Sequence, residues 1–98
     1  MFMKIHESEK SVVVALCDKE LLGRVLTEGE TVLDLKGYAY FYKGREATAE
    51  EAREAMKGAT SINLVGKRSV ALAEKLGLVS KKEIRRIGGT PHAQVYRV

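Results

Sequence analysis

Short strand-like patterns, either alternating apolar and polar residues or a brief apolar run, recur along the whole chain. The predicted strands cover residues 2–8, 11–17, 31–35, 38–43, 61–65, 83–87 and 93–98. The first two are separated by Glu9-Lys10, and the last two are joined across Gly88-Gly89-Thr90-Pro91. Each of these two pairs is therefore predicted to form a hairpin.

Three other segments carry apolar residues at the spacing of a helix face. The first begins after Asp18, which suits an N-cap, and ends at Gly29. Its apolar stripe consists of Leu21, Leu22, Val25 and Leu26. The second helix opens with a capping box formed by Thr48 and Glu51, and the third follows Gly66.

The resulting order of elements, β-β-α-β-β-α-β-α-β-β, predicts an α+β fold. We expect a single compact domain over residues 1–98, because no linker or internal repeat divides the chain. Its sheet would be mixed or mostly antiparallel, with about three helices packed on it. The helix after residues 61–65 would allow a parallel crossover to the terminal strands.

Neither a membrane segment nor a signal peptide is predicted. The longest apolar run, Val12–Cys17, is too short to cross a bilayer, and the N-terminus lacks the apolar core of a secretion signal. We therefore expect a cytoplasmic protein. Cys17 is the only cysteine and ends an apolar run, which favours a small buried side chain over a reactive thiol. Many Lys, Arg and Glu, with one Asn, one Gln and no Trp, are typical of thermophile proteins.

The net charge of +4 is unevenly distributed along the chain. Residues 1–60 hold nine Lys and Arg against eleven Asp and Glu, a net charge of −2. Residues 61–98 hold eight Lys and Arg against two Glu, a net charge of +6. Clustered basic side chains attract phosphates, so the C-terminal part is a candidate surface for an anionic partner. The alternative is an ordinary solvated, charge-rich surface.

The segment from Asn63 to Ser69 is the first candidate binding site. It predicts a strand, then Gly66, then Lys67 and Arg68 at the start of a helix. Free backbone N–H groups and the positive end of the helix dipole favour an anion there. The spacing matches neither a Walker A loop nor a dinucleotide fingerprint. The alternative is a strand-to-helix turn with a structural glycine.

The second candidate site is a row of tyrosines. In a strand over residues 38–43, Tyr38, Tyr40 and Tyr42 would share one face. An exposed row of this kind could stack unpaired bases. The alternative is a row that packs under a helix, with the hydroxyls at its rim.

The closing segment is the third candidate site. Two glycines in the turn could present backbone N–H groups to an anion, two arginines flank them, and a row of polar side chains follows on one strand face. The candidate binding residues are Arg85, Arg86, Gly88, Gly89, His92 and Gln94. The alternative is a rigid hairpin whose polar row faces solvent.

Catalytic and metal-binding motifs are weak. His6, His92 and one cysteine are too few for a typical metal site, and no serine lies in a nucleophile elbow. His92 is the only acid–base candidate, and it has no identifiable partner in the sequence. We therefore predict no catalytic residue, no metal and no cofactor.

Several stretches spanning nearly the whole chain match one known pattern. They are Met3-Lys4-Ile5-His6, Ala15-Leu16-Cys17-Asp18, Leu22-Gly23, Tyr40-Phe41-Tyr42, Asn63-Leu64-Val65-Gly66 and Gly89-Thr90-Pro91-His92-Ala93-Gln94. On these residues the chain resembles an archaeal family known as domain of unknown function 424. The resemblance implies a small cytoplasmic archaeal protein. It brings no established activity, cofactor or catalytic residue.

The leading hypothesis is a non-enzymatic module that binds nucleic acid, and RNA in particular, through its basic C-terminal region. Lys67, Arg68, Arg85 and Arg86 would hold phosphates, while His92 and Gln94 would make directional contacts. One alternative is a protein-interaction adaptor that uses the edge of the terminal hairpin by strand addition. Another is a binder of a small phosphate-bearing ligand at residues 66–69.

Overall fold

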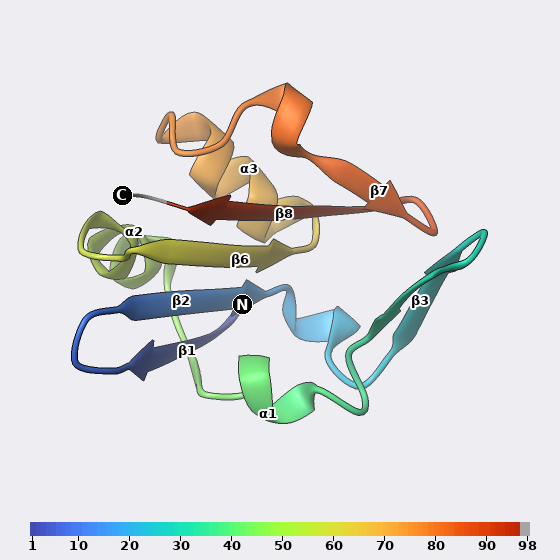
Figure 1. The fold of residues 1–98 in the computed structure, drawn as a ribbon, viewed down its shortest axis with the longest axis horizontal. Coiled ribbons are helices and arrows are strands. Elements are labelled where there is room, and N and C mark those ends of the chain that lie inside the picture. The colour runs from blue at the N-terminus through green and yellow to red at the C-terminus, as the bar shows by residue number, and fades with distance from the viewer. Residues whose placement is uncertain (97–98) are drawn as a thin grey trace.

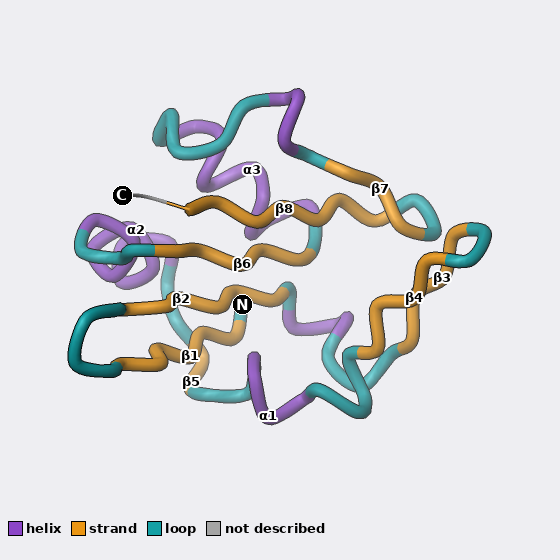
Figure 2. Tube along the Cα trace, viewed as in Figure 1, coloured by secondary structure: helices purple, strands orange, loops and turns teal. Residues whose placement is uncertain are grey.

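A six-stranded sheet runs through the molecule, and a separate two-stranded hairpin lies against one end of it (Figure 1). The computed structural model describes residues 1–96. The strand order of the large sheet is β5-β1-β2-β6-β8-β7. Its strands are β1 (Phe2–Glu7), β2 (Val12–Cys17), β5 (Arg45–Glu46), β6 (Ser61–Val65), β7 (Arg85–Ile87) and β8 (Thr90–Tyr96). The small sheet pairs β3 (Val25–Glu28) with β4 (Thr31–Asp34), both visible in Figure 2.

The predicted α+β class and mixed sheet are confirmed. β2 and β6 pair in parallel, whereas every other pair in the sheet is antiparallel. β6 and β7 both run antiparallel to β8, which lies between them. They therefore run parallel to each other, and the connection from β6 to β7 is the parallel crossover that the sequence allowed.

Two helices cover one face of the large sheet (Figure 1). They are α2 (Ala49–Lys57) and α3 (Lys67–Lys75). The predicted capping box opens α2, because the Thr48 hydroxyl accepts the Glu51 N–H while the Glu51 carboxylate accepts the Thr48 N–H. The buried core on this face consists of Met3, Val14, Leu16, Ala52, Met56, Ala59, Ile62, Leu64, Val70, Ala73, Val79, Ala93 and Val95.

The opposite face of the sheet is covered only in part. The β3–β4 hairpin and the short helix α1 (Ala39–Tyr42) pack on it and form a second, smaller core. This core consists of Ala15, Cys17, Leu21, Leu26, Leu35, Tyr42, Val65 and Ile87. No helix of the described residues covers the remaining part of this face, which the polar residues of β6 and β8 occupy.

The helix predicted after Asp18 is wrong. The chain forms a single 3-10 turn over Lys19–Leu21 and then the β3–β4 hairpin, with Gly29 in its turn at a φ of 60°. Along β3, Leu26 is buried and its neighbours Val25 and Thr27 are exposed, which is the period of a strand. β-branched residues on both arms favour this hairpin over a helix.

The strand predicted over residues 38–43 is also wrong, since this segment contains α1. The Asp34 carboxylate accepts hydrogen bonds from the N–H groups of Lys36 and Gly37, and this turn leads the chain into the helix. The three tyrosines therefore do not form one row. Tyr38 and Tyr40 are exposed, whereas Tyr42 is buried in the second core.

The terminal hairpin is confirmed with shifted boundaries. β7 starts at Arg85 after a 3-10 turn over Lys81–Glu83, and β8 starts at Thr90. Residues 97 and 98 of the predicted last strand lie outside the described residues. Within residues 1–96, no helix is both long and apolar enough to cross a membrane.

Candidate functional site

The uncovered part of the sheet is hollowed into a groove made of two adjoining depressions. The larger, of about 460 Å³, is lined by Glu28, Thr31, Val32, Leu33, Lys82, Glu83, Arg85, Arg86, Ile87, His92, Ala93, Gln94 and Tyr96. The smaller, of about 270 Å³, is lined by Leu33, Asp34, Tyr38, Phe41, Tyr42, Asn63, His92 and Gln94. Leu33, His92 and Gln94 line both depressions, so they join into one groove.

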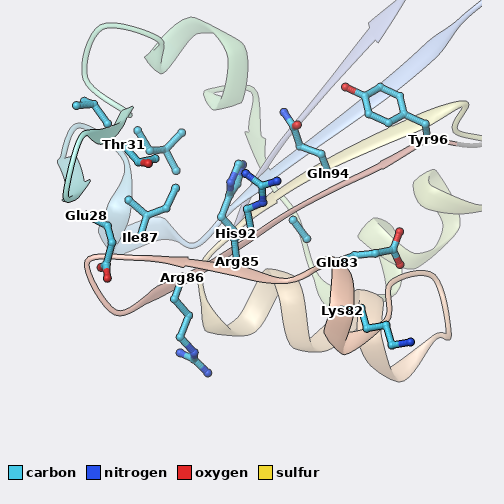
Figure 3. A pocket seen from close by; sticks show the side chains of 13 residues that line it. Glu28, Thr31, Lys82, Glu83, Arg85, Arg86, Ile87, His92, Gln94 and Tyr96 are labelled. Carbon is cyan, nitrogen blue, oxygen red and sulfur yellow. The ribbon is translucent and has the colours of Figure 1, made fainter.

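Strand register places the polar residues of the groove floor side by side. Asn63 on β6 is the register partner of Gln94 on β8, and His92 is the partner of Arg85 on β7. His92, Gln94 and Tyr96 share one face because side chains two residues apart along a strand point the same way. Figure 3 shows Gln94 and Tyr96 on the same side of β8. The Gln94 Nε2 donates to the Asn63 Oδ1 at 2.9 Å, which fixes the two amides against each other.

The β3–β4 hairpin forms the wall of the groove and is tied to the terminal hairpin. The Gly88 N–H donates to the Glu28 Oε1 at 2.8 Å, across 60 positions of sequence. Gly88 has a φ of 58°, and a Cβ at this position would lie 3.0 Å from the Thr27 carbonyl oxygen. A side chain at this position would therefore strain the backbone and press against the Thr27 carbonyl oxygen.

The two arginines of the closing segment lie on opposite faces of β7. Arg85 is on the groove face beside His92, and Figure 3 shows the two side chains together. Arg86 points away from them in Figure 3 and donates to the Gly89 carbonyl at 3.3 Å. Partial burial, and then the nearby Arg85 charge, lower the pKa of His92. His92 is therefore neutral at physiological pH and has one ring nitrogen that donates and one that accepts.

The start of α3 is occupied by a carboxylate of the chain itself. The Arg68 and Ser69 N–H groups donate to Asp18 at 2.9 and 2.8 Å, and the Ser69 hydroxyl donates to Asp18 at 2.8 Å. Asp18 is 1% exposed. Gly66 has a φ of 108°, and a Cβ there would overlap the Asp18 carboxylate. These N–H groups therefore do not face an external anion, and Gly66 has a structural role.

The glycine turn of the terminal hairpin is filled in a similar way. The Gly88 N–H, which the sequence predicted would face an anion, donates to the Glu28 carboxylate. Gly89 is exposed and does not line the groove. Both backbone anion sites expected from the sequence thus hold carboxylates of the chain, and the side chains of the groove carry the candidate site.

The chain is similar to a known protein family and to a solved structure. The family model described as "Protein of unknown function (DUF424)" matches residues 6–98. The chain belongs to this family. A solved structure titled "Crystal structure of an uncharacterized conserved protein from Methanopyrus kandleri" is 31% identical, with a TM-score of 0.81. The match covers 99% of this chain and 90% of that one. No protein of curated function matches the chain.

This DUF424 chain brings four predicted site residues onto the groove floor: Asn63, Arg85, His92 and Gln94. Arg86 lies at its rim, and Tyr38 and Tyr42 line its smaller depression. Neither depression is lined by Gly66, Lys67, Arg68, Gly88, Gly89 or Tyr40.

Sequence reasoning missed the wall of the groove, which Leu33, Asp34 and Phe41 help to form. Phe41 falls in a segment whose element type was assigned wrongly, whereas Leu33 and Asp34 lie in a strand that was predicted but whose hairpin partner β3 was expected to be helical. The signal that could have found the hairpin is the Glu-Gly-Glu turn at residues 28–30, between two arms rich in β-branched residues.

The Cys17 thiol and the Tyr42 phenol of the DUF424 chain are both protonated at neutral pH. Burial, followed by the nearby Asp18 charge, raises the pKa of the Cys17 thiol to about 12. A thiolate is therefore absent at neutral pH. Burial also raises the pKa of the Tyr42 phenol. Within residues 1–96, no three His, Cys, Asp or Glu side chains gather in a way that could hold a metal ion.

Proposed function

We propose that this DUF424 chain binds single-stranded RNA on the uncovered face of its sheet. The observation that carries the proposal is the convergence of Asn63, Arg85, His92 and Gln94, from three neighbouring strands, in one open groove. These side chains offer hydrogen bonds and a fixed positive charge on a solvent-accessible surface. This combination suits a ligand with both polar base edges and phosphates.

Each of the two depressions is lined by one exposed aromatic ring. Tyr96 is 74% exposed, and it lines the larger depression. Tyr38 is 59% exposed, and it lines the smaller one. Large exposed rings around a groove are typical of binding surfaces, and stacking of a base on such a ring is worth about 1–3 kcal/mol. Stacking requires unpaired bases, which favours a single strand over a duplex.

The charges of the groove are compatible with a phosphate backbone. Arg85 and Lys82 contribute positive charge. Of the two carboxylates in the larger depression, Glu28 accepts the Gly88 N–H, and Glu83 accepts the N–H and hydroxyl of Ser80. These two carboxylates keep their charge, but Lys82, Arg85 and Arg86 outnumber them, so the lining of the larger depression is net positive.

A second set of cations lies behind the groove. The Gly66 N–H donates to the Pro91 carbonyl, and Pro91 is the register partner of Arg86. The backbone that carries Lys67 and Arg68 is therefore close to that of Arg86. These exposed side chains are outside the groove floor, where they would attract RNA at longer range rather than contact bases.

The two alternative functions have weaker support. An adaptor that binds by strand addition needs an accessible edge strand, but the edge strand β7 has three residues and two exposed arginines. Short, charged edges oppose strand addition. A phosphate-bearing ligand at residues 66–69 would have to compete with Asp18 for the Arg68 and Ser69 N–H groups.

Binding of fluorescently labelled single-stranded RNA, measured by anisotropy over a series of salt concentrations, tests the proposal. We expect affinity to fall as salt rises, and duplex RNA to bind more weakly. Arg85→Ala should weaken binding by about tenfold, which is about 1.4 kcal/mol. Lys75→Ala removes the same charge from the helix-covered side and should change affinity less than about twofold.

Two results would contradict the proposal. One is an affinity for RNA that does not depend on salt. The other is an equal loss of affinity in Arg85→Ala and Lys75→Ala, which would mean that only the net charge of the protein matters.

A further inference from the structure

The smaller depression of the groove differs chemically on its two sides. Aromatic and apolar side chains from Leu33, Tyr38, Phe41 and Tyr42 form one side. Asn63, His92 and Gln94 form the other. A flat ring with a hydrogen-bonding edge needs this arrangement, with apolar contact for its face and polar groups for its edge.

The aromatic side is held in place before any ligand arrives. Phe41 stacks on His6 with ring centroids 4.6 Å apart, and it meets Tyr42 edge-to-face at 5.1 Å. The His6 Nε2 also lies 2.9 Å from the Phe41 carbonyl oxygen, within hydrogen-bonding distance. Fixed walls lower the conformational entropy that binding would otherwise cost.

The polar side offers both donors and acceptors. The hydrogen bond from Gln94 to Asn63 uses one N–H of Gln94 and one lone pair of Asn63. Each amide has further capacity, including the Nδ2 donors of Asn63 and the Oε1 acceptor of Gln94. Neighbouring donors and acceptors are what the edges of unpaired nucleobases present.

The charges give the groove a direction. The Asp34 carboxylate lies at the aromatic end, in the smaller depression, whereas in the larger depression the three cations Lys82, Arg85 and Arg86 outnumber Glu28 and Glu83. A phosphate would be repelled at the first end and attracted at the second. His92 and Gln94 line both depressions and would lie beside the part of the ligand between base and phosphate.

We propose that the smaller depression takes one unstacked nucleobase, with the phosphate of the same nucleotide unit beside Arg85. This inference rests on the proposed RNA binding and specifies where a single nucleotide sits. The same chemistry is found in a free nucleoside monophosphate and in one unit of an RNA strand. The ligand class is therefore a phosphorylated nucleoside in either form.

Calorimetric titration with uridine, adenosine, cytidine and guanosine monophosphates, each compared with ribose 5-phosphate, tests the inference. We expect at least one nucleotide to bind about tenfold more tightly than ribose 5-phosphate, because only the nucleotide fills the aromatic end. Asn63→Ala should remove this preference, and so should Gln94→Ala, which changes an exposed side chain. Arg85→Ala should weaken the binding of both the nucleotides and ribose 5-phosphate. Lys75→Ala is the control and should change neither, and a thermal melt checks that each variant folds.

Equal affinities for nucleotides and ribose 5-phosphate, or no binding of either at millimolar concentration, would overturn the base pocket. The RNA-binding proposal is judged separately with the labelled oligonucleotide. If the strand binds and Arg85→Ala weakens it while nucleotides show no preference, the base pocket is wrong and the RNA-binding surface stands. If free nucleotides show the preference and the strand does not bind, the pocket serves small nucleotides and the RNA proposal is wrong.

Discussion

Asp18 at the end of β2 and Ser69 in the first turn of α3 are joined by two hydrogen bonds of 2.8 Å. Both bonds end on the same carboxylate oxygen, Oδ1, and the Ser69 N–H and hydroxyl are the donors. The second oxygen accepts the Arg68 N–H at 2.9 Å. One buried side chain from the first half of the chain therefore caps a helix of the second half, 50 positions away.

Replacement of Asp18 should destabilise the whole domain. Asp18→Ala leaves the Arg68 and Ser69 N–H groups without their acceptor, so we expect the free energy of unfolding to fall by about 2–4 kcal/mol. Thr48→Ala removes the exposed cap of α2 and should cost about 1 kcal/mol. Urea denaturation of both variants measures this difference. Equal losses would mean that Asp18 is an ordinary surface cap.

Gly66 should tolerate no side chain. Its φ of 108° and the closeness of the Asp18 carboxylate both exclude a Cβ, so Gly66→Ala should lower the free energy of unfolding by more than about 2 kcal/mol. Gly58 has a φ of −97°, and a Cβ there would meet no atom within 4 Å. Gly58→Ala should therefore be neutral or stabilising by up to about 1 kcal/mol. Thermal denaturation of the pair checks this order, and the reverse order would contradict it.

The hydrogen bond between Glu28 and Gly88 should hold the groove wall in place. Glu28→Ala should speed hydrogen exchange of the Gly88 amide by about tenfold, because that N–H loses its acceptor. Glu30→Ala, an exposed change in the turn of the same hairpin, should leave the exchange rate unaltered. If Glu28→Ala also leaves it unaltered, the hairpin is held by its apolar contacts alone.

His92 should make the domain less stable in mild acid. Its pKa is lowered by burial and by Arg85 in the folded state, whereas in the unfolded chain it is about 6.5. Well above about pH 6.5 both states are neutral at this residue. Below that value the unfolded state binds the proton more readily, so the free energy of unfolding falls as the pH drops towards the lowered folded-state pKa.

His92→Gln removes this contribution. Between about pH 7 and pH 5, the variant should lose less stability than the original protein, as measured by urea denaturation at each pH. The difference between the two curves isolates His92 from the carboxylates and from His6. If the unfolding free energies of the two proteins change with pH in parallel, the loss of stability in mild acid does not come from His92.

Local sequence patterns were sufficient where one interaction dominates. The Thr48–Glu51 capping box and the apolar run at residues 61–65 predicted α2 and β6, because each signal depends on nearby residues. The segments at residues 19–29 and 38–43 were assigned wrongly because their patterns fit more than one structure, whereas the strand predicted at residues 31–35 between them is β4. Leu21, Leu22, Val25 and Leu26 have helical spacing, but the packing of Leu26 in the second core favours the hairpin.

Of the candidate site, only the polar row on β8 was predicted as a shared face, because its residues are close together in the sequence. His92 and Gln94 share a face in any strand that contains them, so the polar row could be read directly. The wall could not, since it depends on Glu28 reaching Gly88 across 60 positions. The cap of α3 could not be predicted either, because Asp18 was expected to cap a different helix.

The most direct test of RNA binding on the open sheet face uses the side-chain amide signals in a nitrogen–proton NMR spectrum. Asn63 and Gln94 are the only Asn and Gln of the chain, and both line the groove. Their side-chain NH₂ groups therefore give the only carboxamide signals of the protein. Titration with single-stranded RNA should shift both pairs of signals, while inorganic phosphate at the same ionic strength should not. RNA that leaves both pairs unchanged, or that shifts only backbone signals of α2 and α3, would contradict the account.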